Sequence, residues 1–203
     1  MNGGYKFLTF SSDSNRIALQ NYAEYNWMRP RMLNPAYLSL GSNVGNRENH
    51  IHDALARLQA LGRVAAVSSF YETEPVEFTD QPWFLNCAVF LETTEKPEHL
   101  LRTLLGIEQE MGRVRTQKKG PRTIDIDLLL LGDTILDSPA LTIPHPAMHQ
   151  RRFVLEPLAE IAPDVEHPIL RKTIRRLLQD LPAGQTVRKL SKKLATEYTD
   201  SRG

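Results

Sequence analysis

The chain has 203 residues, of which 41% are hydrophobic and 24% charged, and its formal net charge is +1. This length suits one domain with a buried core. The small net charge excludes binding to a polyanion through bulk charge, so any nucleotide or nucleic-acid site must come from local clustering. The single cysteine, Cys87, excludes an internal disulfide framework and a zinc cluster of thiolates. Its apolar neighbours favour a core residue over a nucleophile.

The two ends of the chain differ from its middle. Residues 1–34 are polar and aromatic without a clear period. They are expected to be an N-terminal extension, either a disordered segment or one upstream of a true start at Met32. Residues 35–182 are expected to form the folded domain, and residues 183–203 a charged tail that frays. No apolar stretch approaches the ~20 residues that span a bilayer, and no secretory signal is present, so a cytoplasmic location without membrane contact is expected.

The first elements follow one another clearly. Ala36–Leu40 is apolar and alternating, which predicts a strand. Apolar residues at helical spacing then predict a helix, with Gly62 as its C-cap. The apolar positions of this helix are Ile51, Leu55, Leu58 and Leu61. The β-branched and aromatic run Val64–Thr73 predicts a strand, and Trp83–Leu91 predicts its partner. Glu74–Pro82, with its prolines, is predicted to be the loop between them.

A second helix and strand follow, and then a C-terminal part. Pro97 opens the second predicted helix at a position where its missing N–H costs nothing, and Gly112 closes it. The inner stripe of this helix is Leu100, Leu104, Ile107 and Met111. Ile124–Leu131 is predicted to be a strand. Helical segments are expected near Val154–Ile161 and Ile169–Leu181.

The order of these elements predicts the fold class. Strand, helix, strand, strand, helix and strand form an α+β fold with a ferredoxin-like βαββαβ core. Such a core is an antiparallel sheet with its helices packed on one face, which leaves the other face for ligands. The C-terminal helices are expected to add to this core.

Asp125 and Asp127 are the first candidate site residues. They alternate with apolar residues on the last predicted strand, so both point to one face. Side chains two residues apart on a strand are roughly 7 Å apart. Two carboxylates at this separation repel unless a cation lies between them, and hard cations such as Mg²⁺ suit them. The alternative is a solvated strand face with ordinary acids.

A basic loop immediately precedes the acidic pair. Its cations are Arg113, Arg115, Lys118, Lys119 and Arg122. Basic loops alone are usually just solvated. Beside carboxylates they fit phosphoryl chemistry, in which metals bridge phosphate oxygens and Arg or Lys takes the remaining charge. Arg in particular binds phosphate bidentately.

Two further clusters are candidates. His145 and His149 are four residues apart, as in some zinc sites, but no third ligand has suitable spacing. A phosphate contact from His145 and Arg151 fits the other features better. Between the two middle strands, Phe84 could stack on a flat heterocycle while Asn86 reads its edge. From spacing alone, a core Phe84 and a turn Asn86 are favoured.

Several motifs together carry a resemblance. In chain order they are Gly41-Ser42-Asn43, Ser69-Phe70-Tyr71-Glu72-Thr73, Asp80-Gln81-Pro82, Phe84-Leu85-Asn86, Gly112-Arg113-Val114-Arg115, Gly120-Pro121-Arg122-Thr123-Ile124-Asp125-Ile126-Asp127 and Pro144-His145. This set resembles the 6-hydroxymethyl-7,8-dihydropterin pyrophosphokinase family of folate biosynthesis. The resemblance runs from about Ala36 to about Leu181, and the run that ends at Asp127 is its most specific part.

The resemblance implies an activity and a set of site residues. The family transfers the β,γ-pyrophosphoryl unit of ATP to the hydroxymethyl oxygen of the pterin and releases AMP. The implied cofactor is Mg²⁺, as two ions held by Asp125 and Asp127, with ATP as co-substrate. The implied catalytic residues are Arg113, Arg122, Asp125 and Asp127. The implied ATP contacts are Arg113, Arg115, Arg122, Thr142, His145 and Arg151. The implied pterin contacts are Thr73, Val76, Phe84, Asn86 and Phe153.

The sequence departs from the family pattern at a few positions. Many members carry Arg-Trp where this chain has Lys118-Lys119, a Tyr where it has Pro146, and a Leu where it has Val76. These differences concern loop closure and a nucleotide contact, and none of them touches the acidic pair.

Three other functions fit parts of the sequence. A nucleic-acid-binding module would place aromatics, not Asp125 and Asp127, on the central strands. A regulatory domain of the same fold would have no reason to collect acids, Arg and His. A kinase that moves only the γ-phosphoryl group would release ADP. We therefore expect small-molecule substrates, no nucleic-acid partner and a monomer.

Overall fold

The computed structural model describes residues 33–75, 80–112 and 120–190. The expected N-terminal extension up to residue 32 and the last 13 residues of the expected tail, 191–203, lie outside this range. The elements, in chain order, are β1 (Asn34–Ser42), α2 (Arg47–Leu58), β2 (Gly62–Val67), β3 (Tyr71–Thr73), β4 (Phe84–Thr93), α3 (Pro97–Glu110), β5 (Asp125–Leu131), β6 (Leu136–Asp137), β7 (Thr142–Ile143), the 3-10 helix η1 (Met148–Gln150), α4 (Arg152–Ile161), α5 (Ile174–Asp180) and β8 (Val187–Lys189).

The centre of the fold is a six-stranded sheet with the strand order β5-β1-β4-β3-β8, and β2 also pairs with β4. The pairings are antiparallel. The mixed α/β architecture with an antiparallel sheet is therefore as expected. A small second sheet joins β6 to β7.

The expected strand Val64–Thr73 is in fact two strands. The chain leaves the ladder at Ser68, whose hydroxyl accepts the backbone N–H of Ala88 at 2.9 Å. A side chain thus replaces a main-chain acceptor at this point, and the chain rejoins β4 only at Tyr71. Sequence patterning missed the break because Ser68 lies inside a run of strand-forming residues.

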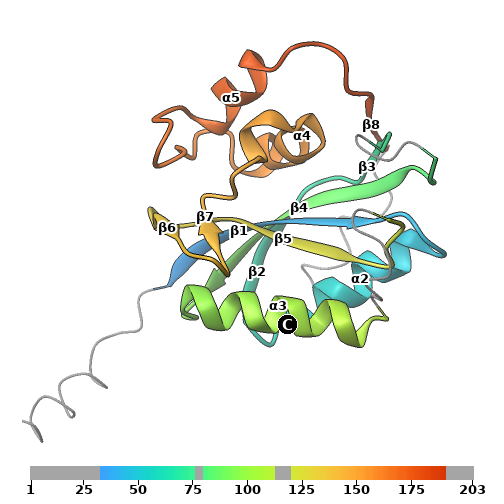
Figure 1. Cartoon of the computed structure of the whole chain (residues 1–203), viewed down its shortest axis with the longest axis horizontal. Helices are drawn as coiled ribbons and strands as arrows, with labels where there is room; N and C mark the ends of the chain where they lie inside the picture. Colours follow the sequence, from blue (N-terminus) through green and yellow to red (C-terminus); the bar gives the residue numbers. More distant parts are fainter. Residues whose placement is uncertain (1–32, 76–79, 113–119, 191–203) are drawn as a thin grey trace, which may run out of the picture. The chain divides into compact units, whose positions relative to one another are not determined.

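The two faces of the sheet bury separate cores. On one face, Leu38 and Leu40 of β1 pack with residues of α2 and α3. On the other, Tyr37 of β1 and Ala88 of β4 pack with residues of α4 and α5. Figure 1 shows α2 and α3 on one side of the sheet and α4 and α5 on the other. The expectation that the second face stays free for ligands is therefore wrong where α4 covers it, because the apolar stripe of α4 also needs a partner.

Local chemistry explains where the helices begin and end. Asn46 caps α2 by accepting the N–H of Asn49 at 3.1 Å. Gly62 is not the C-cap of this helix, because the cap is Gln59 and Gly62 already begins β2. A Cβ on Gly62 would lie 2.1 Å from the carbonyl oxygen of Glu92, so glycine is required there for strand pairing.

The second helix and the C-terminal part also have clear limits. Pro97 opens α3 as expected, and Gly112 follows its C-cap with φ +85°. Helix α5 begins at Ile174 rather than Ile169, because Thr173 accepts the N–H of Arg176 at 3.2 Å and so fixes the N-terminus. The expectation that the tail of residues 183–203 frays is wrong for β8, which pairs with β3. Among the described residues, none of the helices combines the length and the apolar character that crossing a bilayer requires.

Candidate active site

A row of residues crosses the sheet at the same level on four strands. Asp125 of β5 lies opposite Gly41 of β1, Gly41 opposite Asn86 of β4, and Asn86 opposite Tyr71 of β3. Residues that lie directly opposite each other share a face of the sheet. The acid expected at the metal and the amide expected at the pterin therefore share one face, two strands apart.

Gly41 makes this arrangement possible. A Cβ at position 41 would lie 2.5 Å from Oδ1 of Asn86 and 3.7 Å from Cδ1 of Phe84. The space that any other residue would fill is thus occupied by the side chain of Asn86. A glycine on a central strand is a common sign of such a close approach.

Asp127 lies one row further along β5, opposite Ser39. Burial and, next in size, the nearby charge of Asp125 raise the pKa of Asp127 to about 7, and the charges of Arg151 and Arg122 limit the shift. Two acids on one face of a strand therefore share a place from which water is partly excluded. A cation between them would remove the repulsion, as the sequence pattern predicts.

Arg122 provides a fixed positive charge beside Asp125. Its guanidinium forms an ion pair with Oδ2 of Asp125 through Nη1, and its Nε donates to the carbonyl of Gly120 at 3.2 Å. Both side chains of the pair are largely buried, at 21% and 19% exposure. This arrangement aims one edge of the guanidinium at the acid and holds the loop that leads into β5.

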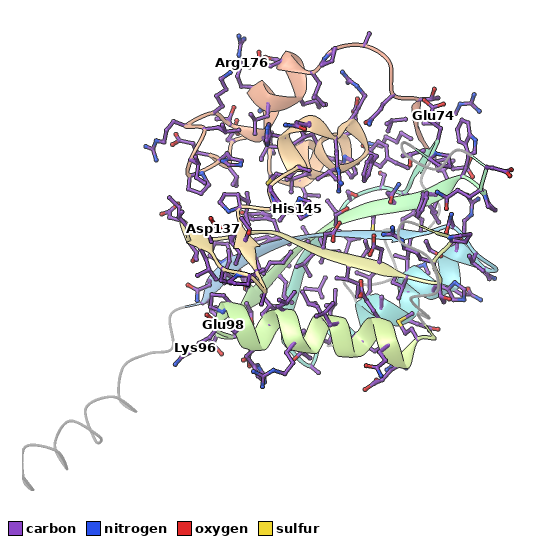
Figure 2. The ribbon with its side chains drawn as sticks, in the orientation of Figure 1. Glu74, Lys96, Glu98, Asp137, His145 and Arg176 are labelled. Atoms are coloured by element: carbon purple, nitrogen blue, oxygen red, sulfur yellow. The ribbon has the colours of Figure 1, made fainter. Side chains whose placement is uncertain are left out.

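His145 is attached to the same strand. Its backbone N–H donates to the carbonyl of Leu129 at 2.9 Å, and its Nδ1 accepts the N–H of Ala147 at 3.3 Å. Nε2 therefore carries the proton of the neutral ring and can donate to an anion. Burial lowers the pKa of His145, the charge of Arg151 lowers it further, and Asp125 opposes both. Figure 2 shows His145 between α4 and the sheet.

Arg151 and Phe153 come from the start of α4. The guanidinium carbon of Arg151 lies 5.7 Å from the centroid of the Phe153 ring. The charge of Arg151 acts on both Asp127 and His145, which places it among the same group of ionisable residues. The structure thus brings Arg122, His145 and Arg151 to the acidic pair.

Three of the residues expected to bind the pterin lie on β3 and β4. Nδ2 of Asn86 donates to the hydroxyl of Thr73 at 2.7 Å, and both residues are buried. Asn86 is therefore a strand residue and not a turn residue. Phe84, opposite Thr73, is only half-buried and so is not a full core residue. It shares a face with Asn86, since the two are separated by one residue on β4.

Some expected site residues are not joined to this group. Thr142 lies on β7, where its hydroxyl donates to Oδ1 of Asp137 at 3.2 Å. An ATP contact from Thr142 stays a prediction. Three of the expected site residues lie outside the described part of the chain: Val76, Arg113 and Arg115.

The sequence also raised a zinc site and a reactive cysteine. Among residues 33–75, 80–112 and 120–190, no group of three or more His, Cys, Asp and Glu could hold a metal ion, so the zinc alternative gains no support. The ring of His149 instead packs edge-on against that of His167. Cys87 is fully buried, and burial raises its pKa to about 12. It is a core residue, as expected.

Two residues of the site were missed by sequence reasoning. Glu108 of α3 is 2% exposed, and its Oε1 accepts the N–H of Ile126 at 2.7 Å, between the two acids. Its charge contributes to the raised pKa of Asp127. The available signal was its position four residues after Leu104 on the buried stripe of the helix. Asn43 was noted only as part of a motif, although its side chain joins three segments.

The chain is similar to known proteins of one family. The family model described as "7,8-dihydro-6-hydroxymethylpterin-pyrophosphokinase (HPPK)" matches residues 37–163. The 2-amino-4-hydroxy-6-hydroxymethyldihydropteridine pyrophosphokinase of Bacillus subtilis is 47% identical over 137 residues, which cover 66% of this chain and 82% of the relative. The relative of the same name from Pseudomonas aeruginosa is 44% identical over 139 residues, covering 68% of this chain and 86% of the relative.

Other similar proteins are longer. The folic acid synthesis protein fol1 of Schizosaccharomyces pombe is 46% identical over 150 residues, which cover 73% of this chain but only 20% of the relative. The chain thus spans about a fifth of that relative's length. A crystal structure of Plasmodium falciparum HPPK-DHPS matches with a TM-score of 0.59 at 18% identity, covering 75% of this chain and 46% of that one. This last match supports the fold alone. Because the family model covers more than half of its length, the chain belongs to the 7,8-dihydro-6-hydroxymethylpterin-pyrophosphokinase family.

Proposed function

We propose that this chain transfers a pyrophosphoryl group from ATP to 6-hydroxymethyl-7,8-dihydropterin, giving AMP and the pterin diphosphate, in folate biosynthesis. The observation that carries the proposal is the meeting of Asp125 and Asp127 with Arg122, His145 and Arg151 on one face of the sheet. Membership of the family and the names of the bacterial relatives support the same activity. A cytoplasmic monomer that acts on small molecules is part of the proposal.

The acidic pair fits magnesium. Burial beside Asp125 makes the charged form of Asp127 costly without a cation, as its raised pKa records. Mg²⁺ is usually held by one or two carboxylates together with waters and phosphate oxygens, and the pair offers this number. Asp125 and Asp127 would hold the two ions that the resemblance implies. When bound, Mg²⁺ neutralises the charge of a triphosphate.

The remaining charged groups would bind and orient the triphosphate. Arg122 and Arg151 present guanidinium groups, which match phosphate oxygens bidentately. His145 can donate from Nε2 while its Nδ1 is held by Ala147, so the ring stays neutral and correctly turned. Arg122 and His145 are held by their neighbours before the substrate arrives, so these two donors need little reorganisation during the reaction.

The pterin, which accepts the pyrophosphoryl group, would bind near Asn86, at the other end of the row of residues from Asp125. Asn86 is fixed by Thr73 at 2.7 Å and can read the edge of a flat heterocycle. Phe84 and Phe153 offer aromatic faces on which a pterin ring can stack. The chain would thus place the hydroxymethyl oxygen in line with the phosphate it attacks, which is the main requirement of this chemistry.

The reaction balances without a strong base from the protein. The hydroxymethyl oxygen forms a bond to the β-phosphorus, and the bond between that phosphorus and the oxygen bridging to the α-phosphorus breaks. AMP leaves with the bridging oxygen. The proton of the hydroxyl passes to solvent, because none of the described site residues is assigned the role of general base.

We also propose that the sheet is ferredoxin-like. The order β5-β1-β4, followed outward by β2 and β3, is the order that a βαββαβ chain produces if β2 and β3 together count as its second strand. The helices α2 and α3 fall at the two helical positions of that sequence of elements.

Nucleotide products test the proposed function. Protein, ATP, Mg²⁺ and hydroxymethyldihydropterin are mixed, and the nucleotides are separated by ion-exchange chromatography. We expect AMP to appear only when the pterin is present, in a ratio of one to one with the pterin diphosphate. ADP as the pterin-dependent product would indicate transfer of the γ-phosphoryl group alone and would overturn the proposal. Asp127→Ala should abolish AMP formation, whereas the matched control Asp133→Ala, at an exposed acid beyond the end of β5, should keep it.

A further inference from the structure

Residues 185–190, here called the anchor segment, follow the part of the chain that the family model matches. They nevertheless extend the central sheet. Within the segment, β8 pairs with β3, with Val187 opposite Thr73 and Lys189 opposite Tyr71. The N–H of Leu190 continues this pairing by donating to the carbonyl of Phe70 at 2.8 Å. The anchor segment therefore covers the edge of the strand that carries Thr73.

The pairing continues past the end of β3. The N–H of Thr186 donates to Oε1 of Glu74 at 2.9 Å, and the N–H of Glu74 donates to the carbonyl of Thr186 at 3.4 Å. This reciprocal pair fixes the residue that follows Thr73. Since Thr73 accepts a hydrogen bond from Asn86, the anchor segment supports the residues proposed to bind the pterin.

Gln185 contacts a different element. Its Oε1 accepts the N–H of Arg152, the first residue of α4, at 2.7 Å. The helix has no side-chain cap of its own at Arg151. The first N–H groups of a helix lack partners within the helix, so a distant side chain has taken the place of the local cap. Arg151 and Phe153 flank the residue that Gln185 holds.

Side chains fasten the anchor segment to the body of the protein. Nζ of Lys189 lies 3.2 Å from Oε2 of Glu160 on α4. The guanidinium carbon of Arg188 lies 4.8 Å from the centroid of the Trp83 ring, next to Phe84. The segment is thus held from both faces of the sheet, because neighbouring strand residues point to opposite faces.

We propose that the anchor segment positions the two sides of the substrate site relative to each other. Gln185 is a positioning residue for Arg151 and Phe153, and Glu74 is a positioning residue for Thr73 and Asn86. Neither is a catalytic residue. The inference rests on the proposed function, since it assigns Phe153 and Asn86 to the pterin and Arg151 to phosphate.

The first test is Gln185→Ala. Loss of this part-buried acceptor leaves the N–H of Arg152 without its side-chain partner, and we expect the KM for the pterin to rise about 5–30-fold. Gln185→Glu keeps an acceptor oxygen and should restore the KM to within about threefold of the wild type. The matched control is Gln179→Ala, at an exposed glutamine of α5.

The second test is Glu74→Ala, which removes the carboxylate that accepts the N–H of Thr186. This change affects only the residues proposed to bind the pterin. We expect a higher KM for the pterin and an unchanged KM for ATP, whereas Gln185→Ala also raises the KM for ATP through Arg151. This variant decides the matter if Gln185→Ala fails to fold. The tests use the full chain, with melting temperature measured alongside.

The outcomes separate this inference from the proposed function. If the wild type forms no AMP, the proposed function fails. If the wild type forms AMP but Gln185→Ala and Glu74→Ala lower only the melting temperature, with both KM values unchanged, the anchor segment is merely structural and the inference is overturned. Failure of Gln185→Glu to restore the KM would also overturn it.

Discussion

Asn43 and Arg122 bind each other at two points. The N–H of Arg122 donates to Oδ1 of Asn43 at 2.7 Å, and the N–H of Asn43 donates to the carbonyl of Arg122 at 3.1 Å. Nδ2 of Asn43 also donates to Oε1 of Gln81 and to the carbonyl of Pro82. One buried amide thus joins the end of β1 to the loop before β5 and to the loop before β4.

Replacement of Asn43 is therefore expected to disturb the site without touching a substrate. Asn43→Ala leaves the N–H of Arg122 without its acceptor, so the guanidinium beside Asp125 loses its support. We expect kcat to fall about 10-fold and the free energy of unfolding to fall by about 1–3 kcal/mol. Steady-state kinetics and urea unfolding measure the two effects, with Asn49→Ala, at an exposed position of α2, as control. Wild-type kcat in Asn43→Ala would contradict this role.

Asp127→Asn should separate stability from activity. The pKa of Asp127 is raised from 3.8 to about 7, so the folded protein binds its proton more tightly than the unfolded chain does. The resulting stability is present below pH 4 and is lost as pH rises through about 7. In magnesium-free buffer at pH 8 the variant should be more stable by about 1–3 kcal/mol, because each unit of pKa shift is worth about 1.4 kcal/mol and the partial exposure of the side chain reduces the full value.

The same variant should lose at least about 100-fold in kcat, since a group that stabilises charge in the transition state is removed. Calorimetric unfolding at pH 5 and pH 8 and the AMP assay measure the two properties, and Asp133→Asn is the control. A variant that is less stable than the wild type at pH 8, or one that stays fully active, would refute the role given to Asp127.

Phe84→Ala should weaken the pterin more than ATP. Stacking of a flat ring on an aromatic side chain is worth about 1–3 kcal/mol, so pterin affinity should fall about 5–150-fold. Phe90→Ala is the matched control, because Phe90 lies on the same face of β4 but stacks on Tyr37. Calorimetry gives both affinities, and equal losses for the two substrates would argue against stacking at Phe84.

Glu160→Gln should change the dependence of stability on pH. Partial burial raises the pKa of Glu160, but hydrogen bonds from Tyr71, Ser69 and Lys189 outweigh this effect, so the pKa lies below its ordinary value. A lowered pKa contributes stability above the ordinary value of 4.5, and this contribution is lost as pH falls through the folded pKa.

The variant should therefore be less stable than the wild type by about 1–2 kcal/mol at pH 7, and the difference should shrink toward pH 3.5. Urea unfolding across this range measures it. Asp164→Asn, at a carboxylate that is 80% exposed, should show little effect. A difference that stays constant with pH would show that the charge of Glu160 is not involved.

Much of the fold could be predicted because its elements have regular patterns. The alternation of Ile124, Asp125, Ile126 and Asp127 fixed which side chains share a face, and Pro97 marked the start of α3. These are local signals, and local signals survive in the folded chain when packing agrees with them. The positions of Arg122 and the acidic pair followed from the same local reasoning.

The rest depended on contacts between distant residues. Strand β8 has three residues and no period of its own, so only its pairing with β3 defines it. In the sequence, Glu108 is an ordinary charged residue of a helix, and only the hydrogen bond that its carboxylate accepts from the N–H of Ile126 distinguishes it. The break at Ser68 likewise comes from a hydroxyl that meets Ala88 across the sheet. None of these partners lies near its counterpart in the sequence.

In the proposed function, the two acids on β5 hold divalent cations against a triphosphate. A crystal structure with Mn²⁺, an unreactive ATP analogue and hydroxymethyldihydropterin is the decisive test, because anomalous scattering identifies the metal. We expect Mn²⁺ to be bound to both Asp125 and Asp127 and to phosphate oxygens of the analogue. A bound nucleotide with both carboxylates facing solvent and no metal beside them would contradict it.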